Sequence, residues 1–467
     1  MSRSLMLPIL LFCSTVVYAQ PKYINISPEE ASQKAGKDNK IVMMVIASEK
    51  CEECNAVANA GILAARETID SNCLLIKQQK LPLFFSNTNS IYYIPENFFG
   101  VIWYDQYFNM LNVLSSSSSS KYPYVQGVQK AMLDFKSQAS SFKQLKQNYF
   151  NEIGSYAAIK QLIDKVSKIG LEPHADIIDE LTQRAPEDSA NSIEFLQYVL
   201  RCAPAISSAA QKYTEKKRDN YMMAWWRMLL KDRIQINNRI TFKSLNKAIQ
   251  DKNISYAYQI ASFRQSTFTD KPEEGSKEHA QVMLTYYKGV NDTVNYMRNV
   301  FSYYDRYYMN VKPEEVKRED SLALKNMFQI LPNKMNGALV SKHQTDTYLN
   351  KDSTKQLIRK FTQTVQFAPK SKYYANALNE GAWNIYSFTD NVNYLNKAIL
   401  LAKRALEFSE EPEIADTYAR LLYKTGNKQE AILWEQRAIN LIAKKGLSSN
   451  EFEKVLLSMQ KDVIKID

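Results

Sequence analysis

The sequence is poor in glycine and in long hydrophobic runs. Only 12 of its 467 residues are glycine, well below the roughly 7% of average proteins. Few glycines leave few positions for tight turns, which favours a largely helical chain. Beyond the N-terminus no run approaches the roughly 18 apolar residues of a transmembrane helix, so we expect no membrane span in the mature chain.

Cysteine and histidine are also scarce. The five cysteines are Cys13, Cys51, Cys54, Cys73 and Cys202, and only Cys51 and Cys54 form a Cys-x-x-Cys pair. This number argues against a small fold held together by disulfides. A structural zinc site needs four ligands, and the three histidines are scattered with no second Cys-x-x-Cys, so the sequence does not favour a metal site. No cofactor is expected.

The N-terminus has the parts of a secretory signal peptide. Arg3 precedes an apolar stretch over residues 5–17, and Val17-Tyr18-Ala19 offers a cleavage site. We predict a signal peptide over residues 1–19, whose removal after Ala19 implies a periplasmic or secreted protein. A retained membrane anchor is the alternative, but the apolar stretch is too short to cross about 30 Å.

Residues 20–136 carry a mixed pattern of helices and strands. Ser27-Pro28-Glu29-Glu30 predicts a helix start, and the apolar run over 41–46 predicts a strand buried on both faces. The further expected elements are a helix over 55–69, a strand at 73–76, an antiparallel hairpin from 98–104 and 108–113, a serine-rich loop over 115–120, and a helix over 122–135.

Cys51 and Cys54 follow the strand at 41–46 and precede the next helix. The N–H groups and positive dipole end of a helix N-terminus stabilise a thiolate and lower the pKa of Cys51. Cys54, one turn along, is placed to resolve a mixed disulfide by attacking the sulfur of Cys51. We predict a catalytic redox pair, with a structural disulfide or a relic motif as the alternative. Cys73 and Cys202 are interpreted as buried small hydrophobes.

This region resembles the thioredoxin-like superfamily, in the exported bacterial branch. The resemblance rests on Gly-Lys, Asn-Lys and an apolar strand within residues 35–47, followed by Cys51 and Cys54. It implies an α/β domain with a mixed central sheet flanked by helices. It also implies that Pro95, in Tyr93-Ile94-Pro95, is the family's cis proline, so that Ile94 and Pro95 offer a backbone edge to an extended peptide substrate.

The sequence departs from that superfamily around the cysteines. Lys50 stands in place of the usual Trp, and Glu52-Glu53 in place of Gly-Pro; the strand at 41–46 also lacks a buried acid. Lys50 favours a thiolate at Cys51, whereas the two carboxylates oppose it. These departures support the alternative that the thioredoxin-like domain is only a scaffold.

Beyond Lys136 we expect helices alone, because apolar residues recur at helical spacing without strand alternation. The region is divided into an all-α part over 137–368, with divergent repeats as a hypothesis, and helical repeats over 369–467. The clearest repeat has Gly426 between Ala419 and the pair Ala431 and Ala438, and the matching positions 33 residues upstream are Ala398 and Ala405. This spacing resembles the tetratricopeptide repeat.

The net charge of +11 lies in the helical region, because residues 20–135 hold ten basic and eleven acidic side chains. No arginine-rich tract or nucleic-acid motif is present, so no nucleic-acid partner is expected. The excess is interpreted as a solvated surface, with binding to a polyanionic envelope as an alternative.

The sequence thus predicts an exported thiol-disulfide oxidoreductase-like protein that acts on protein thiols or disulfides, with helical repeats that bind a protein partner. The alternative is a non-catalytic exported adaptor or scaffold whose thioredoxin-like domain is structural. Whether the chain is an enzyme stays open, as does the direction of any redox reaction.

Overall fold

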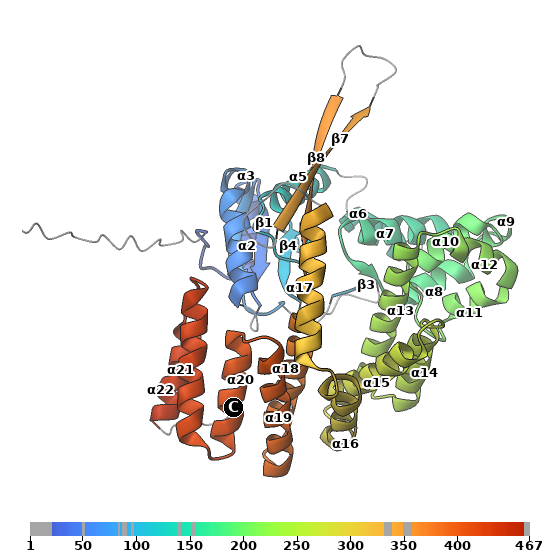
Figure 1. Cartoon of the computed structure of the whole chain (residues 1–467). Coiled ribbons are helices and arrows are strands. Elements are labelled where there is room, and N and C mark those ends of the chain that lie inside the picture. The colour runs from blue at the N-terminus through green and yellow to red at the C-terminus, as the bar shows by residue number, and fades with distance from the viewer. Residues whose placement is uncertain are drawn as a thin grey trace, which may run out of the picture. The chain divides into compact units, whose positions relative to one another are not determined.

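The computed structural model describes residues 21–48, 52–82, 85, 91–94, 98–137, 142–151, 155–330, 339–348 and 357–461. The chain forms two compact units, which meet in sequence between Lys243 and Ser244 (Figure 1). The predicted signal peptide over 1–19 lies outside the described residues. None of the described helices combines the length and apolarity that crossing a bilayer requires.

The first unit is built on a four-stranded mixed sheet. Its strands are β1 (Ile41–Ile46), β2 (Cys73–Gln78), β4 (Gly100–Tyr104) and β5 (Met110–Leu114), in the order β2-β1-β4-β5. The central strand β1 pairs parallel with β2 and antiparallel with β4, and β4 pairs antiparallel with β5. All six side chains of β1 are buried, so the expected strands and hairpin are confirmed.

Four helices lie close to this sheet in sequence. They are α1 (Pro28–Lys37), α2 (Glu52–Ala64), α3 (Arg66–Asn72) and α5 (Tyr122–Lys136). Helix α1 begins as expected, with a capping box in which Ser27 Oγ accepts from Glu30 N and Glu30 Oε2 accepts from Ser27 N, both at 3.1 Å. The single helix expected over 55–69 is corrected to two helices, because the chain turns at Ala65.

The two faces of the sheet have separate cores. Helices α2, α3 and α5 cover one face, where Trp103 of β4 packs with Ile62, Ile69 and Tyr124. The other face carries Val42, Met44 and Ile102, and its core extends from Ala31 of α1 to Ala210. Apolar side chains far beyond residue 136 therefore complete the second face.

The remaining helices of the first unit begin at residue 142, and side chains from residues 142–210 complete that second face. These helices are α6 (Phe142–Asn151), α7 (Tyr156–Lys168), α8 (Ala175–Gln183), α9 (Glu187–Ala190), α10 (Ile193–Arg201), α11 (Ala209–Lys216), α12 (Arg218–Trp226) and the start of α13 (Leu230–Gln250). Buried residues on them include Ile159, Leu162 and Leu181, each fully shielded from solvent. The boundary expected after residue 136 stays a prediction about sequence organisation, since packing is continuous there.

The expectation of helices alone beyond Lys136 is corrected first in this unit. A short strand β6 (Glu172–Pro173) pairs antiparallel with β3 (Tyr92–Tyr93). The pairing extends by one bond, in which His174 N donates to Ile91 O at 2.9 Å. A separate bond joins the residues before β6 to the four-stranded sheet, since Val113 N of β5 donates to Ile169 O at 2.7 Å. A two-residue strand that pairs across about eighty residues leaves no alternation in the sequence, which is why the pattern did not reveal it.

The second unit is mainly helical. Its elements are the end of α13, α14 (Ile254–Ser266), α15 (Pro272–Gly289), α16 (Thr293–Tyr304), a π-helical turn (Asp305–Met309), α17 (Pro313–Ile330), β7 (Leu339–Tyr348), β8 (Leu357–Gln366), α18 (Lys370–Phe388), α19 (Val392–Phe408), α20 (Pro412–Lys424), α21 (Lys428–Lys444) and α22 (Asn450–Gln460). Strands β7 and β8 form an antiparallel hairpin, orange in Figure 1, which is a second correction to the helix-only expectation.

The last helices pair as the sequence suggests. Helices α18 and α19 lie side by side, as do α20 and α21 (Figure 1). The small residues at the repeat positions, Ala398, Ala405, Ala431 and Ala438, are fully buried. Gly426 turns the chain between α20 and α21 with φ +95°, a left-handed conformation that glycine adopts without strain.

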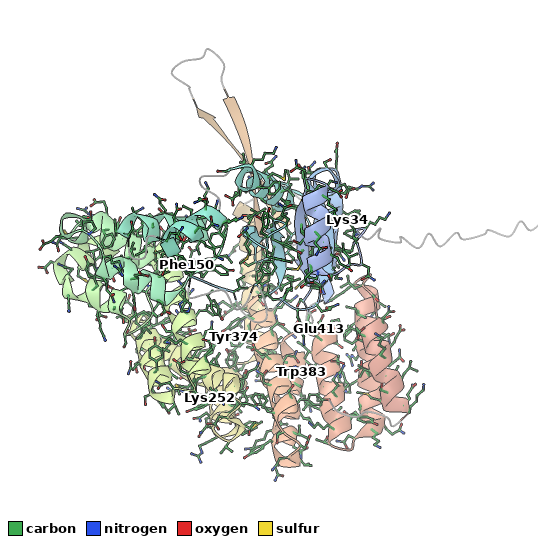
Figure 2. All side chains as sticks on the ribbon, turned by 180° about the vertical axis from the view of Figure 1, so that it is seen from behind. Lys34, Phe150, Lys252, Tyr374, Trp383 and Glu413 are labelled. Atoms are coloured by element: carbon green, nitrogen blue, oxygen red, sulfur yellow. The ribbon has the colours of Figure 1, made fainter. Side chains whose placement is uncertain are left out.

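Aromatic side chains fill much of the second unit. Tyr303, Tyr304 and Tyr308 are nearly buried, and Gly381 of α18 allows close approach, since a Cβ there would lie 2.4 Å from the ring of Tyr304. Tyr374 of α18, labelled in Figure 2, stacks on Phe408 with ring centroids 5.2 Å apart. These contacts show that the aromatic side chains named here serve as packing groups.

Candidate functional site

The candidate site is the corner where β1 ends and α2 begins. Parallel pairing with β2 continues one residue past β1, with Ala47 N donating to Gln78 O at 2.9 Å. Asn55 then ties the two ends of the connection together: its Nδ2 donates to Ser48 O and its Oδ1 accepts from Ser48 N, each at 2.8 Å. Sequence reasoning missed Asn55, whose one signal was its position next to Cys54.

Cys54 is the third residue of α2, half-buried in the first turn, and it takes part in a disulfide. Cys51, predicted as the attacking cysteine, lies outside the described residues, as does Lys50. Glu52 and Glu53 are the first two residues of α2, so two acidic positions stand at the positive end of the helix dipole. The structure therefore places Cys54 at the start of the helix that follows the central strand.

The other two described cysteines differ from Cys54 in their state. Cys73 and Cys202 carry free thiols and are 4% and 5% exposed. Burial raises the pKa of each thiol to about 12, so both stay protonated and unreactive. Their interpretation as buried small hydrophobes is confirmed.

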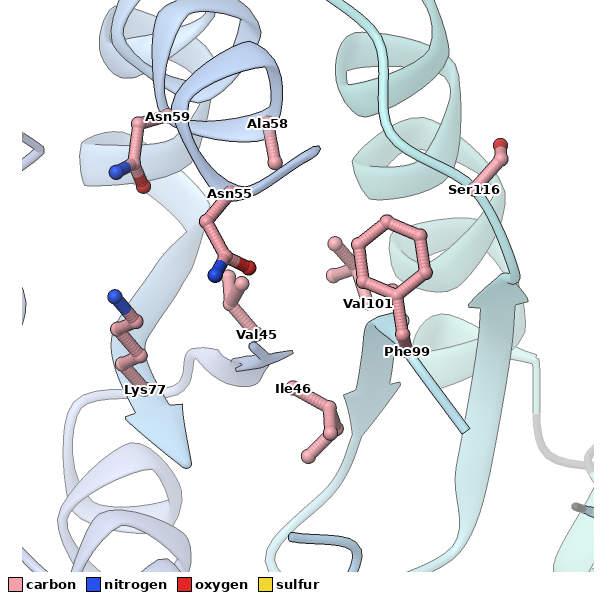
Figure 3. Close-up of a pocket in the computed structure, with 10 residues that line it drawn as sticks. Val45, Ile46, Asn55, Ala58, Asn59, Lys77, Phe99, Val101 and Ser116 are labelled. Atoms are coloured by element: carbon pink, nitrogen blue, oxygen red, sulfur yellow. The ribbon is translucent and has the colours of Figure 1, made fainter. Parts of the chain in front are cut away.

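A small pocket, partly open to solvent, lies beside this connection. Figure 3 shows Asn55, Ala58 and Asn59 of α2 around it, with Phe99, which precedes β4, and Val101 of β4. Its other lining residues are Val45, Ile46, Lys77, Gly100 and Ser116. The pocket thus combines an apolar wall with the side-chain amides of Asn55 and Asn59 and the ammonium group of Lys77. Asn55 directly follows Cys54 in sequence.

The polar side of the pocket is held by Tyr23. Its hydroxyl donates to Asn59 Oδ1 at 2.6 Å, and the ammonium of Lys77 lies 5.7 Å from its ring centroid. Burial raises the pKa of Tyr23 well above its ordinary value, so the hydroxyl keeps its proton and remains a donor. Asn59 and Lys77 are therefore oriented by a neutral tyrosine.

The residues proposed for peptide binding are only partly described. Ile94 is 8% exposed and belongs to the core on the second face of the sheet, whereas Pro95 lies outside the described residues. The backbone just before Ile94 is already paired, since Tyr92 and Tyr93 bond with β6. A substrate role for Ile94 and Pro95 stays a prediction, and it involves backbone rather than the Ile94 side chain.

Acidic and basic side chains also meet in the second unit, between α20 and α21. Arg420 Nε donates to Asp416 Oδ1 at 2.8 Å, and Glu435 beside them is fully buried. Burial, reinforced by the Asp416 carboxyl, raises the pKa of Glu435 to about 9, so Glu435 is protonated at neutral pH. An Asp416–Arg420 ion pair and a neutral buried acid thus lie together between two helices.

In the described part of the chain no group of three or more His, Cys, Asp or Glu side chains could hold a metal ion. No protein-family model and no curated protein matches this chain.

Proposed function

We propose that the chain is an exported thiol-disulfide oxidoreductase-like protein in which Cys51 and Cys54 form the redox pair. One observation carries the proposal: Cys54 is disulfide-bonded in the first turn of the helix after the central strand, whereas Cys73 and Cys202 are free and buried. Cys51 is the partner that sequence spacing favours, because it lies one helical turn earlier.

The topology around the pair supports the same proposal. A thioredoxin-like domain would have a parallel strand-helix-strand unit followed by an antiparallel hairpin and a closing helix, and β1, α2, β2, β4, β5 and α5 follow that order. The central strand has no charged residue among its six, so a buried acid from β1 is not available to the pair. Proton transfer would then involve solvent or groups at the rim of the site.

In the proposed reaction the Cys51 thiolate attacks one sulfur of a protein disulfide and expels the other as a thiolate. Cys54 then attacks the Cys51 sulfur, which releases the second client thiol and leaves Cys51–Cys54 oxidised while the client is reduced. The reverse sequence oxidises a client dithiol. Helix dipole stabilisation of Cys51 assists either direction.

Trapping the intermediate tests this assignment. The Cys54→Ser variant should accumulate mixed disulfides with a disulfide-bonded test protein, since nothing resolves the bond at Cys51. Cys51→Ser should form none, and Cys73→Ser should behave as the wild type because its thiol is buried. Equal trapping by all three variants would remove the basis for the redox pair.

A second candidate function, a non-catalytic adaptor, is favoured by the hairpins of the second unit. Fully buried alanines at the crossings of α18 with α19 and of α20 with α21 are what tetratricopeptide-like repeats would require. In this proposal the repeats bind a protein and the sheet-based unit is a scaffold.

Partner capture by the full chain separates the two candidates. An adaptor retains its partner when Cys51 and Cys54 are both changed to serine. An oxidoreductase that holds clients through mixed disulfides loses them in the same variant and under reducing conditions.

A further inference from the structure

Six large apolar side chains are exposed at the turn between α12 and α13. The described residues include twenty exposed large hydrophobic side chains, and six of these fall within residues 222–234. They are Met222 and Met223 at 44% exposure, Trp226 at 62%, Leu229 at 63%, Leu230 at 64% and Ile234 at 51%. A cluster of this kind marks an interaction surface, whereas single exposed apolar residues need no explanation.

Buried residues on the same two helices fix the turn in place, so the exposed apolar side chains are a feature of the folded structure. Ala224, Met228 and Ile236 point inward at 0%, 4% and 2% exposure. Gln197 of α10 donates to Ala224 O at 3.1 Å. Helices α12 and α13 are drawn in green in Figure 1. The buried residues anchor the turn and leave Trp226, Leu229 and Leu230 facing solvent.

Basic side chains surround the exposed apolar residues. Residues 212–234 contain seven Lys and Arg against three Asp and Glu. Arg227 and Lys231 are exposed and flank Leu229 and Leu230, and no ion pair joins either of them to another described residue. The guanidinium of Arg233 lies 4.3 Å from the ring centroid of Trp226. The turn therefore presents unneutralised positive charge together with an aromatic ring.

This chemistry fits an anionic lipid surface better than a protein groove. Trp concentrates at the boundary between lipid and water, where its ring is apolar and its N–H is polar. Lys and Arg place their aliphatic stems along apolar groups while their charged ends reach lipid phosphates. Protein interfaces are depleted in lysine, whereas attraction to anionic lipid grows with each added Lys or Arg.

We propose that the α12–α13 turn docks the protein peripherally on an anionic membrane surface. Trp226, Leu229 and Leu230 insert among the lipid headgroups, and Arg227 and Lys231 contact lipid phosphates. The docking is independent of the redox pair, and it holds the protein at the membrane without a spanning helix.

Vesicle sedimentation with the full mature chain tests the proposal. Vesicles of phosphatidylcholine with about 30% phosphatidylglycerol should bind the protein, and vesicles of phosphatidylcholine alone should bind far less, because the attraction requires surface charge. Binding should weaken as salt is raised, since salt screens that attraction. The fluorescence of Trp226 should shift to shorter wavelength on binding, and Trp226→Phe should remove that part of the shift.

Two variants separate the apolar and the charged contributions. Trp226→Ser/Leu229→Ser/Leu230→Ser should lower vesicle affinity by at least roughly tenfold, because inserted apolar area is lost. Arg227→Gln/Lys231→Gln should lower it by about thirtyfold at low salt, on the scale of two lipid-facing charges. The matched control Leu433→Ser removes a leucine of 70% exposure in α21 and should leave binding unchanged.

The proposal is overturned if anionic vesicles bind no better than neutral ones, or if both variants bind as the wild type does. It is also overturned if the apolar variant abolishes a concentration-dependent dimer while vesicles never bind, because the turn would then be a protein interface. Unchanged circular dichroism of each variant is required, so that loss of binding is not loss of folding.

Discussion

The two units of the chain are stabilised by different kinds of core. In the first, large side chains such as Trp103, Met43 and Met44 are fully buried on the two faces of one sheet. In the second, fully buried alanines at helix crossings are joined by tyrosines, by the Asp416–Arg420 ion pair and by the fully buried, protonated Glu435. The difference indicates that the stability of the first unit falls when a large buried side chain is made smaller. The stability of the second unit falls when a buried alanine is made larger or when the buried acid ionises.

The largest expected effect is on the first unit. Trp103→Ala removes a fully buried indole between β4 and α5 and should lower the free energy of unfolding by about 3–5 kcal/mol. Urea unfolding gives the loss, and hydrogen exchange locates it in residues up to 243. Trp226→Ala, at an exposed position, should cost about 0.5 kcal/mol or less; an equal loss from both would contradict the core assignment.

The second unit should be sensitive to the opposite change. Ala438→Leu inserts three carbons at a fully buried crossing of α20 and α21 and should destabilise the second unit by about 1–3 kcal/mol. The control Leu433→Ala, at 70% exposure on the same helix, should change little. Faster hydrogen exchange confined to α20 and α21 is the expected readout, and unchanged exchange there would show that the crossing has spare room.

The buried acid of the second unit should make its stability depend on pH. The pKa of Glu435 is raised from 4.5 to about 9 in the folded chain, so its contribution is fully present below pH 4.5 and is lost as pH rises toward 9. Glu435→Gln keeps a neutral side chain and should stabilise the unit by about 1–3 kcal/mol at pH 8 and little at pH 5. Urea unfolding at both pH values measures the difference.

Glu430→Gln is the matched control for that prediction, because Glu430 is exposed on the same helix. Its variant should keep the wild-type slope of stability against pH. A wild-type slope in Glu435→Gln as well would mean that another group titrates in this range.

The smallest expected effect concerns the two acidic residues between Cys51 and Cys54. The Glu52→Gln/Glu53→Gln variant lacks two negative charges that oppose a thiolate at the start of the helix. The reduced form of the cysteine pair is therefore more stable in the variant, and the reduction potential rises. For two carboxylates at the first positions of a helix the change should be about 20 mV. Thiol trapping in glutathione buffers measures it, and Glu67→Gln in the exposed part of α3 should leave the potential unchanged.

The local elements of this fold were predictable from sequence because their causes are local. The capping box at Ser27, the buried strand β1 and the turn at Gly426 each depend on residues within a few positions. The placement of Cys54 at the start of α2 followed from the same reasoning. Cys51 and Pro95 lie outside the described residues, so their roles stay predictions.

The features that sequence missed depend on distant contacts. Strand β6 forms only because Tyr92 and Tyr93 lie opposite it, and the second face of the sheet is completed by helices more than a hundred residues away along the chain. The β7–β8 hairpin pairs two polar-rich segments whose alternation is weak. The sequence does not distinguish Asn55 from other asparagines in helices, because its role depends on its two hydrogen bonds to the backbone of Ser48.

The most direct test of the central claim is the reduction potential of the Cys51–Cys54 pair in the purified mature protein. Equilibration with glutathione or dithiothreitol buffers, followed by thiol trapping, should give a reversible two-electron couple between roughly −120 and −270 mV. A disulfide that does not equilibrate reversibly, or one that stays oxidised far below that span, would contradict a redox role and leave the pair as a structural bond.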